Sequence, residues 1–253
     1  MKIVTWNCAG ALRRKRAALE ALSADVLIVQ ECESPADSAD RSYRDWAERH
    51  AVLWVGQSRH KGLGVFVRPG LRLELVALDD GGLMQFLPCR VEGIPLLAVW
   101  TKDAPSSDRH GYIGQLWHWL RRHPDFLRET RALLAGDFNS NAIWDRQYPG
   151  CSHSDVVHLL ESLGLHSLYH RTREELQGQE RTPTFFLQRN PAKPYHIDYA
   201  FLSACLLEGA RIEIGPPADW LALSDHMPLV VDLSDSGCLH LQRAITADAG
   251  GDQ

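Results

Sequence analysis

The sequence predicts an α/β fold: one domain with a core built mainly of strands and with helices outside. Short apolar runs typical of strands recur along the whole chain, and some are apolar at every position, as in Val26-Leu27-Ile28-Val29. Such runs are typical of strands covered on both faces. Amphipathic helical patterns interrupt them, and no linker, low-complexity tract or internal repeat divides the chain.

Strands are expected along both halves of the chain. The first half of the chain contributes residues 2–7, 25–30, 64–68, 71–78, 84–91 and 94–101. The second half contributes residues 132–137, 166–169, 184–187, 196–202, 210–214 and 228–233.

Helices are expected at residues 12–22, 43–49, 113–122 and 154–163. In the first of them, Leu12, Leu19 and Leu22 share one face, which is the pattern of a helix packed on a core. Ser154 followed by Asp155 suggests the N-terminal cap of the fourth. Residues 1–233 are therefore predicted to form the domain, and the Gly- and Asp-containing residues 234–253 a loosely ordered tail.

Composition excludes several protein classes. The 253 residues are 45% hydrophobic and 23% charged, which is an ordinary globular balance, and no run approaches the roughly 20 apolar residues of a membrane span. Lysine and arginine number 27 against 32 aspartates and glutamates, a net charge of −5. The chain thus lacks the general positive charge with which many proteins grip nucleic acid, and a polyanionic substrate would need local cations or a metal.

The six cysteines form no CxxC pair and no compact Cys/His cluster, which argues against structural zinc. They are expected to be free thiols in a reducing compartment. The N-terminus shows no apolar segment followed by a cleavage site, so we expect a cytoplasmic protein.

Polar side chains stand at or just after the ends of several apolar runs. These are Trp6-Asn7, Gln30-Glu31, Asp137-Phe138-Asn139, His196-Ile197-Asp198 and Ser224-Asp225-His226. A carboxylate at the end of a buried strand is costly without a partner or a cation, and strand-end loops commonly carry catalytic groups. If these segments converge, they form an oxygen-rich pocket that suits Mg²⁺ or Mn²⁺ better than zinc.

The same segments carry a resemblance to a known family. Thr5-Trp6-Asn7, Val29-Gln30-Glu31, Gly136-Asp137-Phe138-Asn139-Ser140, Ile197-Asp198-Tyr199 and Ser224-Asp225-His226-Met227-Pro228 resemble, in order, the motifs of the endonuclease/exonuclease/phosphatase superfamily, whose fold is that of DNase I. Lys61-Gly62-Leu63-Gly64-Val65 is similar to the family's glycine-containing strand entry. The resemblance spans residues 1 to about 233 and implies a four-layer α/β/β/α sandwich of two mixed sheets.

The resemblance also implies a metal site. Glu31 corresponds to the main Mg²⁺ ligand, Asn7 helps to shape the metal and phosphate environment, and Asp225 completes the acidic set. Mg²⁺ or Mn²⁺ is therefore the expected cofactor. Taken singly, Asn7 could be a turn residue before Gly10, and Glu31 a partner of the basic residues that follow Leu12.

Four further residues receive catalytic roles from the resemblance. Asp137 orients or deprotonates the attacking water, and Asn139 holds a phosphate oxygen without adding charge. His226 stabilises the phosphate as an imidazolium, while Asp198 binds the other ring nitrogen of His226 and favours its charged form. The implied reaction is in-line, metal-assisted hydrolysis without a covalent intermediate.

Lys102 and Tyr112, which lie before the Gly136–Ser140 motif, are each open to two interpretations. Tyr112 precedes the third helix, where nuclease-type members carry an active-site tyrosine, but an aromatic residue there can equally pack the helix start. Lys102 follows a strand at a position where sphingomyelinase-like and deadenylase-like members carry histidine. Lysine can bind phosphate by charge, yet it cannot act as a neutral imidazole.

Substrate contacts are the least defined part of the pattern. Arg13 lies in a basic run after Asn7, and Lys61 follows Arg59 and His60, so both segments could form a positive rim, or simply solvated faces. Trp220 could stack on a base or seal the core. The same two alternatives apply to Trp144, with packing favoured.

These observations predict a divalent-metal-dependent phosphodiesterase, foremost a nuclease acting on DNA ahead of RNA, without a membrane span and monomeric. Endonuclease and exonuclease action both remain open. The alternative is a phosphatase or phospholipase C-type hydrolase that acts on a small phosphomonoester, a phosphoinositide or a lipid head group. A non-catalytic binding protein ranks behind both.

Overall fold

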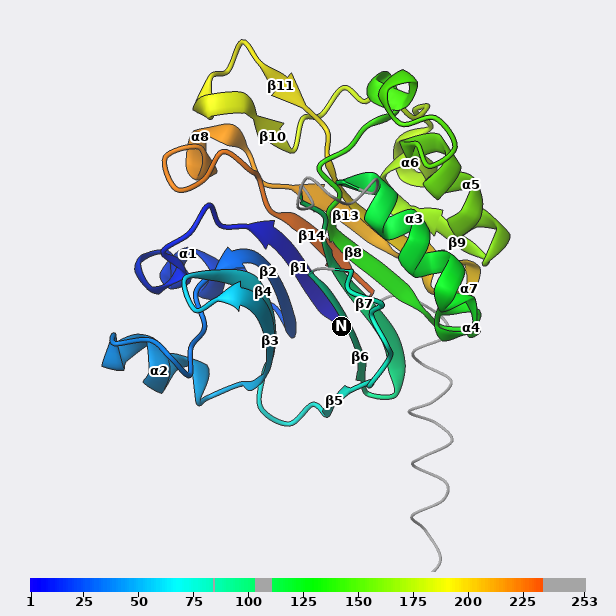
Figure 1. Cartoon of the computed structure of the whole chain (residues 1–253). Coiled ribbons are helices and arrows are strands. Elements are labelled where there is room, and N and C mark those ends of the chain that lie inside the picture. Colours follow the sequence, from blue (N-terminus) through cyan, green and yellow to red (C-terminus); the bar gives the residue numbers. More distant parts are fainter. Residues whose placement is uncertain (84, 103–110, 234–253) are drawn as a thin grey trace, which may run out of the picture.

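The computed structural model describes residues 1–83, 85–102 and 111–233. It contains two six-stranded mixed sheets packed face to face, with helices on the outer faces (Figure 1). The predicted four-layer sandwich is confirmed.

The first sheet has the strand order β13-β14-β1-β2-β4-β3. Its strands are β1 (Lys2–Asn7), β2 (Val26–Cys32), β3 (Ala51–Ser58), β4 (Lys61–Val67), β13 (Arg211–Ile214) and β14 (Leu229–Asp232). β1 and β2 run parallel at the centre, with Asn7 opposite Gln30, and the other neighbours are antiparallel.

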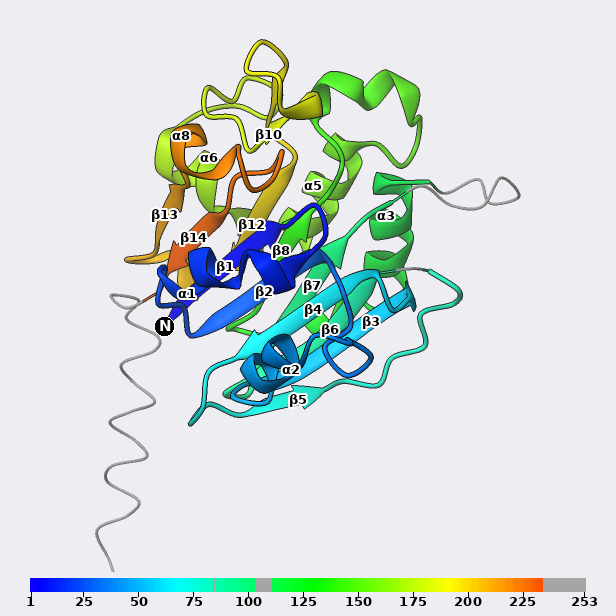
Figure 2. The same cartoon turned by 90° about the vertical axis from the view of Figure 1, so that its left-hand side faces the viewer.

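The second sheet has the order β5-β6-β7-β8-β12-β9. Its strands are β5 (Leu73–Leu75), β6 (Phe86–Val91), β7 (Ile94–Trp100), β8 (Leu133–Asp137), β9 (Leu165–Ser167) and β12 (Asp198–Ser203). β7 and β8 form its parallel pair. A separate two-stranded hairpin, β10 (Phe185–Phe186) with β11 (Pro194–Tyr195), lies with α8 (Pro217–Trp220) at one end of the sandwich (Figures 1 and 2).

Helices cover the outer faces of both sheets. α1 (Arg16–Glu20) and α2 (Arg41–Ala47) pack on the first sheet, while α3 (Ile113–Arg122) and α5 (His153–Ser162) pack on the second. The remaining helical segments are η1 (Leu12–Arg14), α4 (Pro124–Leu127), η2 (Ala142–Gln147), α6 (Leu168–Arg173), η3 (Leu187–Arg189) and α7 (Ala204–Leu207). Within the described ranges no helix is long and apolar enough to cross a membrane.

Strand alternation explains why polar groups meet at one end of the inter-sheet core. Ile3 of β1, Leu133 and Ala135 of β8, and Ala200 of β12 are buried in the cluster between the sheets. Because side chains on the same face recur every second residue, Asn7, Asp137 and Asp198 continue these rows at the strand ends. The core that holds the two sheets together therefore also aligns the polar residues.

Glycine at position 136 is required by the close approach of β7 and β8. A Cβ atom there would lie 1.9 Å from the carbonyl oxygen of Val99, and the backbone φ of +152° disfavours side chains. The next residue is Asp137, so this close contact fixes the backbone that carries the candidate catalytic carboxylate.

Several local predictions differ from the structure. The expected strand at 166–169 is a three-residue strand followed by α6, and the strand at 71–78 is reduced to β5. Strand β3 was not predicted, because its residues are only half-buried and it contains Gly56. The cap of α5 is Ser152, not Ser154, and Ser152 forms a reciprocal capping box with Asp155.

The expectation of six free thiols also needs correction. Cys8, Cys32, Cys89 and Cys151 are free, whereas Cys205 is disulfide-bonded. The predicted start of one strand at Met84 and the predicted tail at residues 234–253 lie outside the described residues. The domain boundary at residue 233 stays a prediction.

Candidate active site

Asp137 is the centre of the candidate site. It ends β8, and its side chain is fully buried. The amide nitrogens of Asn7 and Asn139 donate to Asp137 Oδ2 at 2.9 and 3.0 Å, and the backbone N–H of Asn139 donates to Oδ1 at 2.8 Å. The structure thus brings together three of the predicted residues, from both sheets.

Asn139 holds Asp137 in a way the sequence did not predict. Its backbone has a left-handed φ of 45°, a conformation that asparagine tolerates better than most residues. Its side-chain amide donates to Asp137 and, at 2.8 Å, to the carbonyl oxygen of Thr101. Both amide hydrogens are therefore used within the protein, and the predicted contact of Asn139 with a phosphate oxygen stays a prediction.

His226 and Asp198 form the second part of the site. His226 Nδ1 donates to Asp198 Oδ2 at 3.0 Å and lies 3.2 Å from Oδ1, and both side chains are nearly inaccessible. The carboxylate keeps Nδ1 as a hydrogen-bond donor and aims the other ring nitrogen, Nε2, at Asp137. The predicted His–Asp pair is present.

His226 Nε2 and Asp137 Oδ2 are 3.9 Å apart, which is too far for a hydrogen bond. Both atoms therefore remain able to bind a third group. Although burial opposes the charged imidazolium, the negative charges of Asp198 and Asp137 raise the pKa of His226 to about 9. Burial raises the pKa of Asp137 to about 7, with a contribution from Asp198, against the lowering effects of His226 and the amide of Asn7.

Three residues that we did not predict hold these groups in place. Trp6 Nε1 donates to the carbonyl oxygen of His226 at 2.9 Å. Ser224 Oγ donates to the carbonyl oxygen of Asn7 at 2.7 Å and accepts from the backbone N–H of His226. Thr184 Oγ1 accepts from the backbone N–H groups of Ile197 and Asp198. Trp6 and Ser224 stood within the quoted motifs, whereas Thr184 gave no signal.

Glu31 sits at an irregularity of β2. The register with β4 shifts between Gln30 and Cys32, and Glu31 has a φ of +60°. A bulge of this kind redirects a side chain, and backbone strain in a non-glycine residue often marks a functional position. The Nζ of Lys61 lies 2.5 Å from Glu31 Oε2.

The oxygen atoms of the predicted metal ligands are of the type that suits a hard divalent cation. Glu31 and Asp225 offer carboxylate oxygens and Asn7 an amide oxygen, the ligand type that Mg²⁺ and Mn²⁺ prefer. The carboxylate of Glu31 already forms an ion pair with the ammonium group of Lys61. Its surroundings therefore tolerate a positive charge. Asp225 is half-buried beside the site, where its charge contributes to the raised pKa of His226.

A different group of side chains has metal-ligand spacing. Among the described residues, Asp137, Asp198 and His226 are the one set of three or more His, Cys, Asp or Glu side chains whose ligand atoms lie within 4.8 Å of one another. A histidine that is protonated and bound to a carboxylate is a poor metal ligand, because ligation needs the free nitrogen. The set is therefore chemically better suited to hold a proton and a positive charge than to ligate a metal.

The predicted substrate contacts lie in different surroundings. Arg13 Nη1 pairs with Glu33 at 3.0 Å, so its charge is partly neutralised. Lys102 Nζ donates to Gln57 Oε1 at 3.2 Å and lies 5.7 Å from the centre of the Trp100 ring. Tyr112 is half-buried at the N-terminus of α3, and its backbone N–H donates to the carbonyl of Lys102. Their contact with substrate, and a catalytic role of Tyr112, stay predictions.

Trp220 does not offer a face for base stacking. It is 7% exposed and packs edge-to-face on Trp6 at 5.1 Å between ring centres. The alternative in which it seals the core is the correct one. Its burial follows from the short helix α8, which turns it toward the outer face of β1.

A different set of aromatic rings extends from His226. Phe185 lies 4.6 Å from the His226 ring, Tyr195 lies 6.3 Å from Phe185, and Trp144 lies 5.3 Å from Tyr195. All three aromatic residues are half-buried. We call Phe185, Tyr195 and Trp144 the aromatic row.

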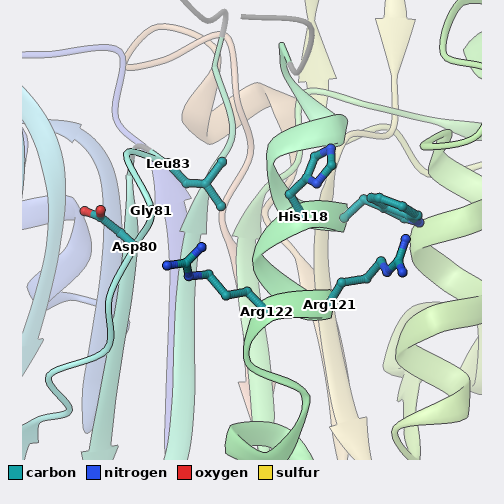
Figure 3. Close-up of a pocket in the computed structure, with 7 residues that line it drawn as sticks. Asp80, Gly81, Leu83, His118, Arg121 and Arg122 are labelled. Atoms are coloured by element: carbon teal, nitrogen blue, oxygen red, sulfur yellow. The ribbon is translucent and has the colours of Figure 1, made fainter.

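A cavity lies elsewhere in the described part of the structure. About 420 Å³ lies between α3 and the loop before β6 (Figure 3), lined by Asp80, Gly81, Leu83, Trp117, His118, Arg121 and Arg122. Arg122 reaches toward the loop and pairs with Asp79. The cavity walls include none of the candidate catalytic residues.

Comparison with known proteins identifies a matching family. The model of the Endonuclease/Exonuclease/phosphatase family matches residues 4–226. No curated protein sequence matches the chain significantly.

Solved structures share the fold. A 3′-5′ exonuclease from Neisseria meningitidis has a TM-score of 0.67 at 21% identity, covering 92% of this chain and 99% of that one. A 3′ phosphatase from Neisseria, bound to a product DNA hairpin, gives 0.66 at 19% identity, with 92% and 98% covered. An AP endonuclease from Archaeoglobus fulgidus gives 0.64 at 17% identity, with 92% and 99% covered.

Proposed function

Because the chain belongs to the Endonuclease/Exonuclease/phosphatase family, we propose that it is a metal-dependent phosphodiesterase that hydrolyses nucleic acid, DNA in the first place. The observation that carries the proposal is the facing pair of Asp137 and His226, 3.9 Å apart, each held by an amide or carboxylate partner. A carboxylate that can take a proton and an imidazolium that can face a phosphate oxygen are the groups that in-line hydrolysis needs.

The two groups divide the chemistry between them. Asp137, with its pKa of about 7, can accept a proton from the attacking water near neutral pH. His226, with its pKa of about 9, stays charged there and can stabilise the negative charge that develops on the phosphate. Asp198 keeps the imidazolium oriented and charged.

Glu31, Asn7 and Asp225 are the residues that would hold Mg²⁺ or Mn²⁺. When bound, the ion supplies positive charge for the phosphate and the departing alkoxide. Glu31, half-buried on its bulge, is the expected main ligand.

Positive charges on both sides of the site support an anionic polymer as substrate. Lys61 contacts Glu31, while Lys15 donates to the carbonyl of Cys8, directly after β1. Arg189 donates to the carbonyls of Ala222 and Leu223, just before the Ser224–His226 segment. On a protein of net charge −5, cations gathered beside the active site attract a phosphate backbone locally.

The aromatic row supports nucleic acid over a small phosphomonoester. Stacking of bases on aromatic side chains contributes about 1–3 kcal/mol per base and is tolerant of sequence. The row lies beside His226 and contains three half-buried rings in succession, which matches consecutive unpaired bases better than a compact head group.

The proposed enzyme is a cytoplasmic monomer. Four free thiols support the proposed reducing compartment. The disulfide bond of Cys205 is evidence against it. Size-exclusion chromatography with light scattering tests the monomer.

The experiment is a substrate panel with and without Mn²⁺ or Mg²⁺. It compares plasmid, single-stranded, abasic and RNA oligonucleotides with a phosphomonoester and a phosphoinositide, using the wild type and Asp137→Asn. We expect cleavage of nucleic acid that chelator abolishes and that Asp137→Asn reduces about 10²–10⁴-fold. Hydrolysis of the phosphomonoester or lipid alone would overturn the nuclease assignment while leaving the site intact. Full activity of folded Asp137→Asn would overturn the site itself.

A further inference from the structure

A second buried polar cluster lies directly behind the active site. Its centre is Asn141, which is 2% exposed and follows Asn139 by two residues. The amide nitrogen of Asn141 lies 3.0 Å from Glu180 Oε2, 2.9 Å from the carbonyl oxygen of His196 and 3.1 Å from Tyr199 Oη. None of these contacts involves a candidate catalytic side chain.

These contacts connect the two catalytic carboxylates. His196 and Tyr199 stand on either side of Asp198 in the chain, and Asn141 contacts both. Tyr199 Oη also lies within hydrogen-bond distance of the carbonyls of Ser140 and His196. One amide side chain therefore ties the loop that follows Asp137 to the strand that begins with Asp198.

Glu180 anchors this amide. Its side chain is 4% exposed, and its Oε1 accepts from His170 Nε2 at 3.0 Å and from the backbone N–H of Gly178 at 2.9 Å. Although burial opposes ionisation, hydrogen bonds from His170 and Asn141 help to lower the pKa of Glu180 to about 2. His170 is fixed in turn by Ser167 Oγ, 2.7 Å from its Nδ1.

The cluster has no ready metal site. His153 Nδ1 and His196 Nε2 are buried without a hydrogen-bond partner, and burial lowers the pKa of both rings. Within the described ranges, however, no three His, Cys, Asp or Glu groups of this cluster have ligand atoms within 4.8 Å of one another. A buried, satisfied network of this kind specifies geometry.

We propose that Asn141, anchored by Glu180, is a positioning residue that sets the separation of Asp137 and Asp198 and so the aim of His226. The inference rests on the proposed function for its kinetic consequence, but not for its structural one. Displacement of a reacting group by about 1 Å from a distant substitution can cost about 10²-fold in rate.

The kinetic test uses Asn141→Asp, which keeps the side-chain oxygen that accepts from the N–H of Ile143 but loses the amide donor. We expect kcat to fall 10- to 100-fold with KM within twofold, because substrate contacts are untouched. Glu180→Gln in the Asn141→Asp background restores a donor opposite Asp and should recover part of kcat. If Asn141→Asp does not fold, the same kinetic test is made with Glu180→Gln alone. This milder change is expected to lower kcat in the same direction.

Glu175→Gln is the matched control. Glu175 is a carboxylate of the same loop that accepts from Tyr169 Oη at 2.7 Å, and its hydrogen bonds run to Tyr169 and Arg181. Its loss is expected to change thermal stability and leave kcat unchanged. Equal kinetic effects of Glu175→Gln and Asn141→Asp at equal stability would overturn the proposal.

A spectroscopic measurement separates this proposal from the nuclease assignment. The proton on His226 Nδ1, bonded to Asp198, gives a downfield NMR signal that needs no substrate. We expect this signal to move or broaden in Asn141→Asp and to stay in Glu175→Gln. An unchanged signal in folded Asn141→Asp would reject the positioning role, whereas a changed signal in a protein without nuclease activity would reject only the proposed function.

Discussion

Asn7 and Asp137 are 130 positions apart, and the amide of Asn7 donates to Asp137 Oδ2 at 2.9 Å. The bond joins the end of β1 in one sheet to the end of β8 in the other, so it crosses the interface between the two sheets. Because both side chains continue rows of core residues, packing of the sheets and formation of the site are the same event.

Asp198→Asn is expected to change the pH dependence of the rate. Burial opposes the imidazolium, and without the negative charge of Asp198 the pKa of His226 falls from its value of about 9, because only Asp137 and Asp225 still favour the charged form. The alkaline limb of kcat/KM therefore moves to lower pH. A pH–rate profile from pH 5 to 10 measures this. The exposed Glu208→Gln should leave the profile in place, and an unmoved limb in Asp198→Asn would contradict the role of the pair.

The metal-free protein is expected to lose stability as the pH rises. Asp137 is raised from 3.8 to about 7 and His226 from 6.5 to about 9, so both favour protonated forms when folded. Their stabilising contribution is complete below pH 3.8 for Asp137 and below pH 6.5 for His226. It is lost as the pH rises through about 7 and about 9, respectively.

Asp137→Asn removes the loss of stability that ionisation of Asp137 causes as the pH rises through about 7. The variant loses an acceptor for the amide groups of Asn7 and Asn139, so we expect it to be less stable than the wild type at pH 5. Because the variant forms no buried charge at this position, we expect this deficit to be smaller at pH 8. Urea denaturation at pH 5 and pH 8, with chelator present, measures the two differences. A deficit that is equal or larger at pH 8 would contradict the raised pKa of Asp137.

Much of this arrangement follows from the sequence, and the remainder has identifiable physical causes. Asp137, Asp198 and His226 were predictable because their motifs end apolar strands, and those strands are core. Trp220 was misjudged for base stacking, because a tryptophan in a loop gives no sign of which face it buries. Asn141 and Glu180 were not predicted, since their partners come from distant segments joined only by the fold.

Glu31→Gln is expected to weaken metal binding. Loss of the carboxylate charge should reduce Mn²⁺ affinity at least about 10-fold by isothermal titration calorimetry. Glu33→Gln is the matched control, because Glu33 accepts from the backbone N–H groups of Leu12 and Arg13 and holds η1 in place. That variant should lose stability and keep its Mn²⁺ affinity. Similar affinity losses in both would refute Glu31 as the main ligand.

Tyr195→Ala tests the aromatic row. Tyr195 stands between Phe185 and Trp144, so its removal interrupts the row. We expect KM for a single-stranded oligonucleotide to rise about 5- to 100-fold, equivalent to about 1–3 kcal/mol, with little change in kcat. Trp220→Phe should instead lower the melting temperature and leave KM unchanged. An unchanged KM in Tyr195→Ala together with a raised KM in Trp220→Phe would show that bases do not bind at the aromatic row.

Gly136→Ala is expected to be severely destabilising. The added methyl group would meet the Val99 carbonyl at 1.9 Å, which forces β7 and β8 apart beside Asp137. A loss of more than about 3 kcal/mol is expected, within the range that overpacking and strain produce. Gly10→Ala has a left-handed φ of +76° but open space, so it should cost only about 1–2 kcal/mol. The melting temperatures of the two variants separate the effects. Gly136→Ala combines a steric clash with backbone strain, whereas Gly10→Ala has backbone strain alone.

The pairing of β1 with β14 brings the two ends of the described domain together. Lys2 lies opposite Asp232, and the N–H of Leu233 donates to the carbonyl of Met1 at 2.9 Å. A short peptide linker can therefore fuse residue 233 to residue 1, and the chain can be reopened at the exposed turn around Gly70. Such a circular permutant would retain every catalytic contact while exchanging which halves of the sandwich are synthesised first.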